Sequence, residues 1–158
     1  MIHVYYGYGK GKTSAAIGAG MRAQGAGKNV LLVQFLKDNK SHELKSVPFN
    51  VFEAPEELGF NPGAEYSEWV ERAYKAIVES ECDFIILDEL LDAIPKFIPL
   101  DDALWTIHAL AVDEAKEVVI TGHKTIDRII NDADYVTHFE KIKHPHDHGV
   151  NARFGIEY

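Results

Sequence analysis

The sequence predicts an α/β fold in which a mainly parallel β-sheet is flanked by helices on both faces, as a three-layer sandwich. Strand-like and helix-like patterns alternate along all 158 residues. The runs DFIIL at residues 83–87 and VLLV at residues 30–33 are nearly continuously apolar, which is typical of parallel strands covered on both faces. No linker, repeat or low-complexity segment interrupts the alternation, so we expect one domain over residues 1–158.

In chain order, strands are expected at residues 2–6, 29–34, 49–53, 83–87, 117–121 and 135–139. Helical patterns occupy residues 13–26, 64–80, 101–115 and 125–131. The first helix is rich in alanine and glycine, so it can lie close to a sheet. The second and third carry apolar stripes, and we expect Trp69 and Trp105 to belong to the core. Residues 36–63 and the tail from residue 141 are irregular, and a long irregular loop in a compact domain is usually functional.

Composition and charge restrict the possible partners. The formal net charge of −9 makes a long polyanion such as nucleic acid a poor partner. The only cysteine, Cys82, excludes an internal disulfide and favours a reducing compartment. The first residues lack a signal-peptide pattern and the longest apolar runs have the length of strands, so we expect a cytoplasmic protein without a membrane partner. Basic residues gather at two places that suit a small anion: Lys10 with Lys12, and Lys141, Lys143 and Arg153.

A glycine- and lysine-rich loop lies between the first strand and the first helix. Its members are Gly7, Tyr8, Gly9, Lys10, Gly11, Lys12, Thr13 and Ser14. Glycines let such a loop turn its N–H groups inward, and the following helix points its positive dipole end at the same spot. Lys12 adds a full charge and the Thr13 hydroxyl can bind Mg²⁺, so the sequence predicts a P-loop NTPase-like domain. The loop is one residue shorter than usual, with Tyr6 at the first glycine position, and a plain glycine turn is the alternative.

An acidic pair follows a buried strand. Asp88 and Glu89 come directly after the run at residues 83–87. Because the carboxyl ends of parallel strands face the ligand crevice, both carboxylates can hold Mg²⁺ opposite Thr13. The alternative is that one of them caps a helix running to Lys96, and capping and metal binding are compatible.

Several stretches match one known pattern. Residues 7–16 (GYGKGKTSAA) are similar to Gly-Asn-Gly-Lys-Gly-Lys-Thr-Thr-Ala-Ala, including its short spacing. Residues 33–37 (VQFLK), 87–90 (LDEL) and 120–122 (ITG) match a Val-Gln-Phe-Ile/Leu-Lys stretch, an acidic strand end and the start of a Thr-Gly-Arg motif. The tail at residues 143–158 matches a C-terminus of the same proteins. Together these stretches resemble, nearly end to end, the P-loop ATP:corrinoid adenosyltransferases, whose acceptors are cob(I)alamin and cob(I)yrinic acid a,c-diamide.

The resemblance implies a reaction and a set of site residues. It implies transfer of the 5′-deoxyadenosyl group of MgATP to cobalt(I) of a corrinoid, with release of triphosphate from a reversed ATP, by a homodimer. Cobalt(I) is itself the nucleophile, so the protein must position ATP, neutralise the leaving triphosphate and exclude water. Catalytic roles are implied for Lys12, Glu89 and Phe60. Magnesium is implied at Thr13, Asp88 and Glu89, and ATP contacts are implied for residues 7–14, His123 and Arg153.

The sequence departs from this family at two positions of the implied site. His123 replaces the arginine of Thr-Gly-Arg, and Pro62 replaces the tryptophan of a Gly-Phe-Thr-Trp segment that appears here as residues 59–62. The resemblance implies that Phe60 presses on the lower corrin face and helps to remove the axial ligand. We therefore expect adenosylation of pre-reduced cobalt(I) to exceed promotion of cobalt(II) reduction.

Two other functions remain open from the sequence. A small P-loop phosphohydrolase or kinase would use Glu89 to activate water or an acceptor hydroxyl, and would yield ADP rather than triphosphate. A non-catalytic nucleotide- or corrinoid-binding module, which His123 and Pro62 suggest, would bind without turnover.

Overall fold

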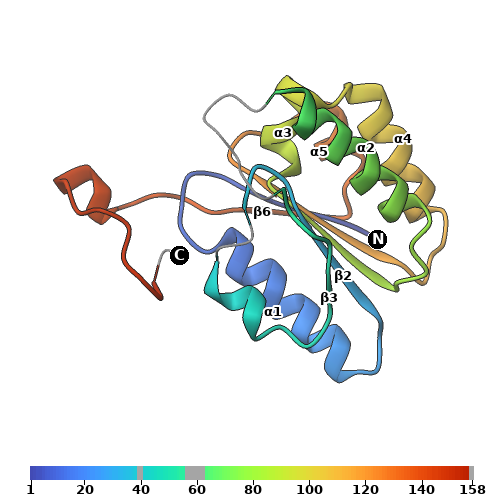
Figure 1. Cartoon of the computed structure of the whole chain (residues 1–158), viewed down its shortest axis with the longest axis horizontal. Coiled ribbons are helices and arrows are strands. Elements are labelled where there is room, and N and C mark those ends of the chain that lie inside the picture. Colours follow the sequence, from blue (N-terminus) through green and yellow to red (C-terminus); the bar gives the residue numbers. More distant parts are fainter. Residues whose placement is uncertain (39–40, 56–62, 157–158) are drawn as a thin grey trace.

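The computed structural model describes residues 1–38, 41–55 and 63–156. They form one six-stranded sheet with helices on both faces (Figure 1), which confirms the predicted three-layer α/β fold. The strand order is β3-β2-β4-β5-β1-β6, and every neighbouring pair is parallel. The strands are β1 (Ile2–Tyr6), β2 (Val30–Gln34), β3 (Asn50–Val51), β4 (Phe84–Asp88), β5 (Glu117–Gly122) and β6 (Tyr135–His138).

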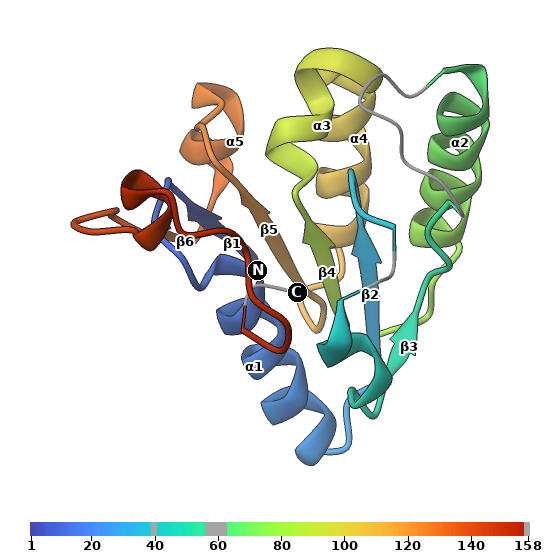
Figure 2. The same cartoon turned by 60° about the vertical axis from the view of Figure 1, so that its left-hand side comes forward.

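The helices divide unequally between the two faces. Helix α1 (Lys12–Gly25) covers one face, and the other helices cover the opposite face (Figures 1 and 2). These others are α2 (Ala64–Val78), α3 (Leu90–Phe97), α4 (Leu100–Ala111) and α5 (Asp127–Asp132). Two short 3₁₀ turns, η1 (His42–Lys45) and η2 (Pro145–His148), lie in the stretches expected to be irregular. None of the helices in the described ranges is long and apolar enough to cross a membrane.

Two hydrophobic cores lie on the two faces of the sheet. Alternate strand residues contribute to opposite cores: Leu87 joins the core under α2–α5, whereas Ile86 joins the core under α1. This explains why the strand runs are continuously apolar rather than alternating. Trp69 is buried in the larger core, as expected. The expectation for Trp105 is wrong, because 63% of its surface is exposed.

Helix α1 lies unusually close to the sheet. A Cβ atom at Gly20 would come within 2.9 Å of Ile86 Cδ1 and 3.3 Å of Val30 Cγ1. Only glycine therefore fits at this contact without a shift of its neighbours, and the prediction from the Ala/Gly-rich sequence is confirmed. The close packing fixes the start of α1, and with it Thr13, against the end of β4.

Strand β4 extends one residue further than expected. The expected strand stopped at Leu87, but Asp88 still pairs in register with Gln34 of β2. A buried carboxylate is tolerated in a sheet only when its oxygens accept hydrogen bonds. Asp88 has four such donors, and they belong to the site described next.

Candidate functional site

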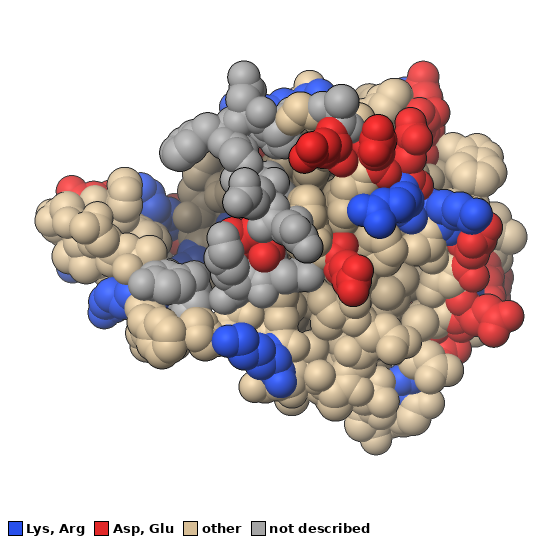
Figure 3. All heavy atoms as spheres, in the orientation of Figure 1, with Lys and Arg blue, Asp and Glu red and all other residues tan. Residues whose placement is uncertain are grey.

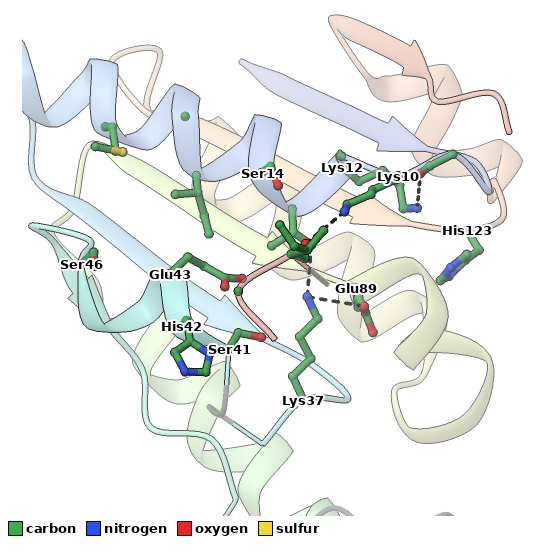
Figure 4. A pocket seen from close by; sticks show the side chains of 18 of the residues that line it. Lys10, Lys12, Ser14, Lys37, Ser41, His42, Glu43, Ser46, Glu89 and His123 are labelled. Carbon is green, nitrogen blue, oxygen red and sulfur yellow. Dashed lines mark hydrogen bonds and ion pairs between the residues drawn. The ribbon is translucent and has the colours of Figure 1, made fainter. Parts of the chain in front are cut away.

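The carboxyl ends of β1, β2, β4 and β5 lead into one pocket of about 840 Å³. Residues 8–14 of the glycine-rich loop line it, as do Lys37, Glu89 and His123, which follow three other strands. The opposite wall comes from η1 and from Gly155 and Ile156 of the tail. Figure 4 shows the lysine side chains of the loop and of Lys37 approaching the same space from different elements.

The loop is shaped by the strands on both sides of β1. Gly7 and Gly11 have φ angles of 118° and 114°, a region that favours glycine. The Gly7 N–H donates to Gly122 O at the end of β5 (3.1 Å), and the Gly9 N–H donates to Phe139 O after β6 (2.7 Å). A Cβ at Gly7 would collide with the same Phe139 oxygen. The close approach of residue 139 therefore requires glycine at positions 7 and 9, whereas the positive φ favours it at position 11.

Lys12 lies inside the loop. Its Nζ donates to the carbonyl oxygens of Gly7 (2.7 Å) and Gly9 (3.2 Å). Burial lowers the pKa of Lys12, although the negative charges of Glu89, Asp92 and Asp88 oppose the change. The ammonium is thus held by weak neutral acceptors, at the place where a P-loop lysine meets phosphate.

Asp88 is fully buried at the centre of a hydrogen-bond network. Its Oδ1 accepts from Thr121 Oγ1 (2.7 Å) and from Thr13 Oγ1 (3.0 Å). Its Oδ2 accepts from Gln34 Nε2 (3.0 Å) and from Lys37 Nζ (2.7 Å). Four donors, two at or just after the end of β2, one at the end of β5 and one in the P-loop, satisfy this carboxylate, so the network is both rigid and sensitive to the loss of any member.

Glu89 lies nearer to the solvent and uses an unusual backbone conformation. Its φ of 59° is left-handed, and its N–H donates to Thr121 Oγ1 (2.8 Å). The side chain makes no capping hydrogen bond to α3, although Glu89 occupies the N-cap position. Its carboxylate instead lies 3.6 Å from Lys37 Nζ. Burial raises the pKa of Glu89, and the charge of Lys37 opposes this.

His123 is held at the rim of the pocket by α3. Asp92 Oδ2 lies 2.9 Å from both the backbone nitrogen and Nδ1 of His123. The imidazole also lies against the ring of Tyr8, with 5.4 Å between centroids. Tyr8 and His123 are therefore neighbours in space, although they lie far apart in the sequence. Both were expected to contact the nucleotide.

The C-terminal tail returns to the loop. Lys10 Nζ donates to Ile156 O (3.0 Å), and the rings of His42 and Phe154 are 4.3 Å apart. Arg153 is exposed on the same segment. Phe60 and Pro62 lie outside the described residues.

The oxygens around Lys37 fit a magnesium ion. Thr13 offers a hydroxyl, and Asp88 and Glu89 offer carboxylates, which are the hard oxygen ligands that Mg²⁺ prefers. A cation, the Lys37 ammonium, already lies among these three groups. Within the described ranges no three His, Cys, Asp or Glu side chains form a metal-binding group. Magnesium here would therefore complete its shell with phosphate oxygens and water.

Comparison with known proteins agrees with this geometry. The family model described as "ATP:corrinoid adenosyltransferase BtuR/CobO/CobP" matches residues 1–158. The chain belongs to this family. It is 32% identical over 169 residues to the corrinoid adenosyltransferase of Escherichia coli (strain K12), covering 100% of this chain and 85% of that one. The corrinoid adenosyltransferase of Pseudomonas aeruginosa (strain PAO1) is 32% identical over 174 residues, with 100% and 83% covered.

Solved structures show the fold at greater distance. AMPPCP-bound DnaA from Aquifex aeolicus superposes with a TM-score of 0.51 at 15% identity, covering 88% of this chain and 40% of that one. A DnaA structure with AMPPCP and single-stranded DNA gives 0.52 at 14% identity and the same coverage. At such identity the likeness supports only the P-loop NTPase fold of the adenosyltransferase.

Four residues of this candidate site were not assigned a role from the sequence: Gln34, Lys37, Asp92 and Thr121. Three of them share a signal, because Gln34 and Thr121 stand at the ends of parallel strands and Lys37 follows β2 closely. Polar residues at that edge of a parallel sheet face the ligand crevice. Asp92 gives no such signal, because it lies in the first turn of α3 rather than at a strand end. It joins the site through its contact with His123.

Proposed function

We propose that this protein is an ATP:corrinoid adenosyltransferase that transfers the 5′-deoxyadenosyl group of MgATP to cobalt(I) of a corrinoid. Cobalt(I) supplies the electron pair of the new Co–C5′ bond, and the C5′–O bond breaks with triphosphate as the leaving group. The observation that carries the proposal is a family member's short P-loop whose Thr13 hydroxyl bonds to the buried Asp88, next to Glu89 at the edge of the same pocket. This arrangement neutralises phosphate charge and requires no protein nucleophile.

The chain's own residues stabilise the leaving triphosphate. Residues 8–14 line the pocket, and the ammonium groups of Lys10 and Lys12 lie beside the space where its oxygens would lie. Magnesium bound by Thr13, Asp88 and Glu89 would supply further positive charge. We assign His123 and Arg153 to contacts with the nucleotide, and Phe60 to the lower face of the corrin.

The remaining properties rest on charge and composition, except the homodimer, which rests on the family resemblance. We propose that residues 1–158 act as one nucleotide-binding domain in the cytoplasm, as a homodimer, without nucleic-acid or membrane partners. Figure 3 shows acidic side chains gathered over α2 and α4, on the face that these helices form. Together with the net charge of −9, this surface disfavours a polyanion.

The test is an assay with ATP, Mg²⁺ and chemically reduced cobalamin. We expect a light-sensitive adenosylated corrinoid together with intact triphosphate. Formation of ADP instead would favour the phosphohydrolase or kinase function. Binding of ATP and corrinoid with no turnover would identify a non-catalytic module.

A further inference from the structure

Lys37 lies where a metal ion would be expected. Its Nζ is 2.7 Å from Asp88 Oδ2, 3.1 Å from Thr13 Oγ1 and 3.6 Å from Glu89 Oε1. These are the three groups whose oxygens fit Mg²⁺. Figure 4 shows the Lys37 side chain reaching across the pocket toward Glu89, with its nitrogen between the elements that carry the oxygens.

The backbone on both sides of this position is strained. Within the described ranges Leu36 and Glu89 are the only residues other than glycine with positive φ, at 57° and 59°. Such conformations persist only where surrounding contacts hold them. The Leu36 N–H donates to the hydroxyl of Tyr66 on α2 (3.0 Å), and this turn directs Lys37 back toward β4. The backbone turn at Leu36 and its hydrogen bond to Tyr66 therefore hold the Lys37 ammonium beside Asp88.

The charges around the ammonium are matched. Lys37 Nζ lies 2.7 Å from the fully buried carboxylate of Asp88 and 3.6 Å from that of Glu89, so the ammonium compensates negative charge that water does not reach. Without a cation at this position, the two carboxylates would repel each other in a poorly solvated site.

We infer that Lys37 is a resident counter-cation that occupies the magnesium position of the empty protein, and that it moves onto the triphosphate when Mg²⁺ arrives with ATP. Two cations cannot share the space between Thr13, Asp88 and Glu89. Lys37 also lines the same pocket as Lys12, so a displaced ammonium remains beside the phosphate oxygens. The inference rests on one part of the proposed function, namely that the pocket binds a magnesium triphosphate.

The first test needs neither corrinoid nor turnover. We would measure the melting temperature of wild type and Lys37→Met during titration with magnesium chloride, at constant ionic strength set by potassium chloride. Wild type should respond weakly, because its site already holds a cation. Lys37→Met should melt lower without magnesium and recover as Mg²⁺ binds, with an apparent affinity for Mg²⁺ about tenfold higher than that of wild type.

Two variants control this test. Lys75→Met removes a lysine whose ion pair with Glu79 on α2 is exposed, and it should change neither the melting temperature nor its magnesium dependence. Lys37→Gln keeps a donor for Asp88 but no charge, so it replaces Lys37→Met if the latter does not fold. Equal stabilisation of wild type and both Lys37 variants by Mg²⁺ would overturn the inference.

The second test uses tripolyphosphate, and here we expect Lys37→Met to lower the affinity rather than raise it. By calorimetry, magnesium tripolyphosphate should bind Lys37→Met about tenfold more weakly than wild type, even though Mg²⁺ alone binds it more tightly. If affinity for magnesium tripolyphosphate is unchanged or increased, Lys37 does not move onto the phosphates. Failure of wild type to bind tripolyphosphate would contradict the proposed nucleotide site instead, and the comparison with Mg²⁺ alone would still decide whether Lys37 occupies the metal position.

Discussion

At the scale of single residues, the Lys12 ammonium donates only to backbone carbonyl oxygens within the described part of the chain. Its ammonium bonds to Gly7 O and Gly9 O and faces the pocket. Lys12→Ala should therefore leave the fold intact and weaken MgATP binding at least about tenfold, because a charge-assisted contact with phosphate disappears. Calorimetry measures the affinity, and Lys28→Ala, which alters an exposed contact with Ala115 O, is the control. Unchanged affinity in Lys12→Ala would mean that the loop does not bind the phosphates.

The two acidic neighbours should behave differently. Asp88→Asn places an amide N–H₂ among four donors, so we expect a loss of about 3 kcal/mol in the free energy of unfolding. Glu89→Gln keeps the shape of a group whose pKa burial already raises, so its stability should stay near wild type while magnesium-dependent turnover falls. Urea unfolding together with the adenosylation assay separates the two effects. Full activity of Glu89→Gln across a magnesium titration would remove Glu89 from the metal site.

Two tyrosines of α2 give a matched pair of hydroxyl deletions. Tyr66 accepts the Leu36 N–H, and burial raises the pKa of its phenol to about 12. Tyr66→Phe leaves that N–H unpaired and should destabilise the protein by about 1–3 kcal/mol. The buried Tyr74 hydroxyl has no partner among the described residues, so Tyr74→Phe should be neutral or stabilising. Equal losses by chemical denaturation in both variants would show that the Tyr66 bond has no special role.

Sequence motifs could predict only those site residues that belong to a short characteristic stretch of the chain. The pairing of Thr13 with Asp88 followed from a P-loop threonine and an acidic strand end. The role of Lys37 could not be predicted from the sequence. The direction of its side chain depends on the left-handed backbone of Leu36 and on the hydroxyl of Tyr66 in α2, 30 residues further along the chain. Phe60 lies outside the described residues, and its contact with a corrin stays a prediction.

At the scale of elements, β5 and α3 approach each other too closely for a side chain. A Cβ at Gly122 would lie 2.5 Å from Leu91 Cβ and 3.0 Å from Asp92 Oδ2. Gly122→Ala must push α3 away, so we expect destabilisation of about 1–3 kcal/mol and weaker nucleotide binding through His123. Gly25→Ala at the end of α1 meets no atom within 4 Å and should be neutral or stabilising by up to about 1 kcal/mol. Urea midpoints compare the two, and equal stability would contradict the close approach.

The elements themselves could be predicted to different degrees. Buried strands were located within one or two residues, because continuous apolar runs bounded by polar residues are a strong signal. The expected strand at residues 49–53 forms only two residues, since β3 is an edge with one neighbour. In α4 the buried stripe includes Leu104 and Ile107, and Trp105 points away from it because one residue turns a helix by about 100°.

At the scale of the whole molecule, the tail is separable from the core. None of residues 151–156 belongs to either hydrophobic core, yet Phe154 and Ile156 contact both walls of the pocket. A chain that lacks residues 151–158 should unfold at nearly the same urea concentration and bind MgATP several-fold more weakly. Substitution of Ile142, which is exposed elsewhere on the tail, by Ser controls for general effects there. A large drop in the urea midpoint would mean instead that the tail supports the fold.

The interior position of β1 has a consequence for biosynthesis. Of the six strands, β1 is made first, yet it lies between β5 and β6, which are made after the other four, with Ile2 opposite Val118 and His3 opposite Tyr135. Strand β1 must therefore wait for its sheet partners until β5 and β6 are made, whereas β2 and β4 can pair earlier. Because the Gly9 N–H also donates to Phe139 O, the phosphate loop reaches its shape only after residue 139 has been made. Nucleotide binding thus reports that β6 has been made, because a polypeptide interrupted before β6 leaves β1 and its loop without their permanent neighbours.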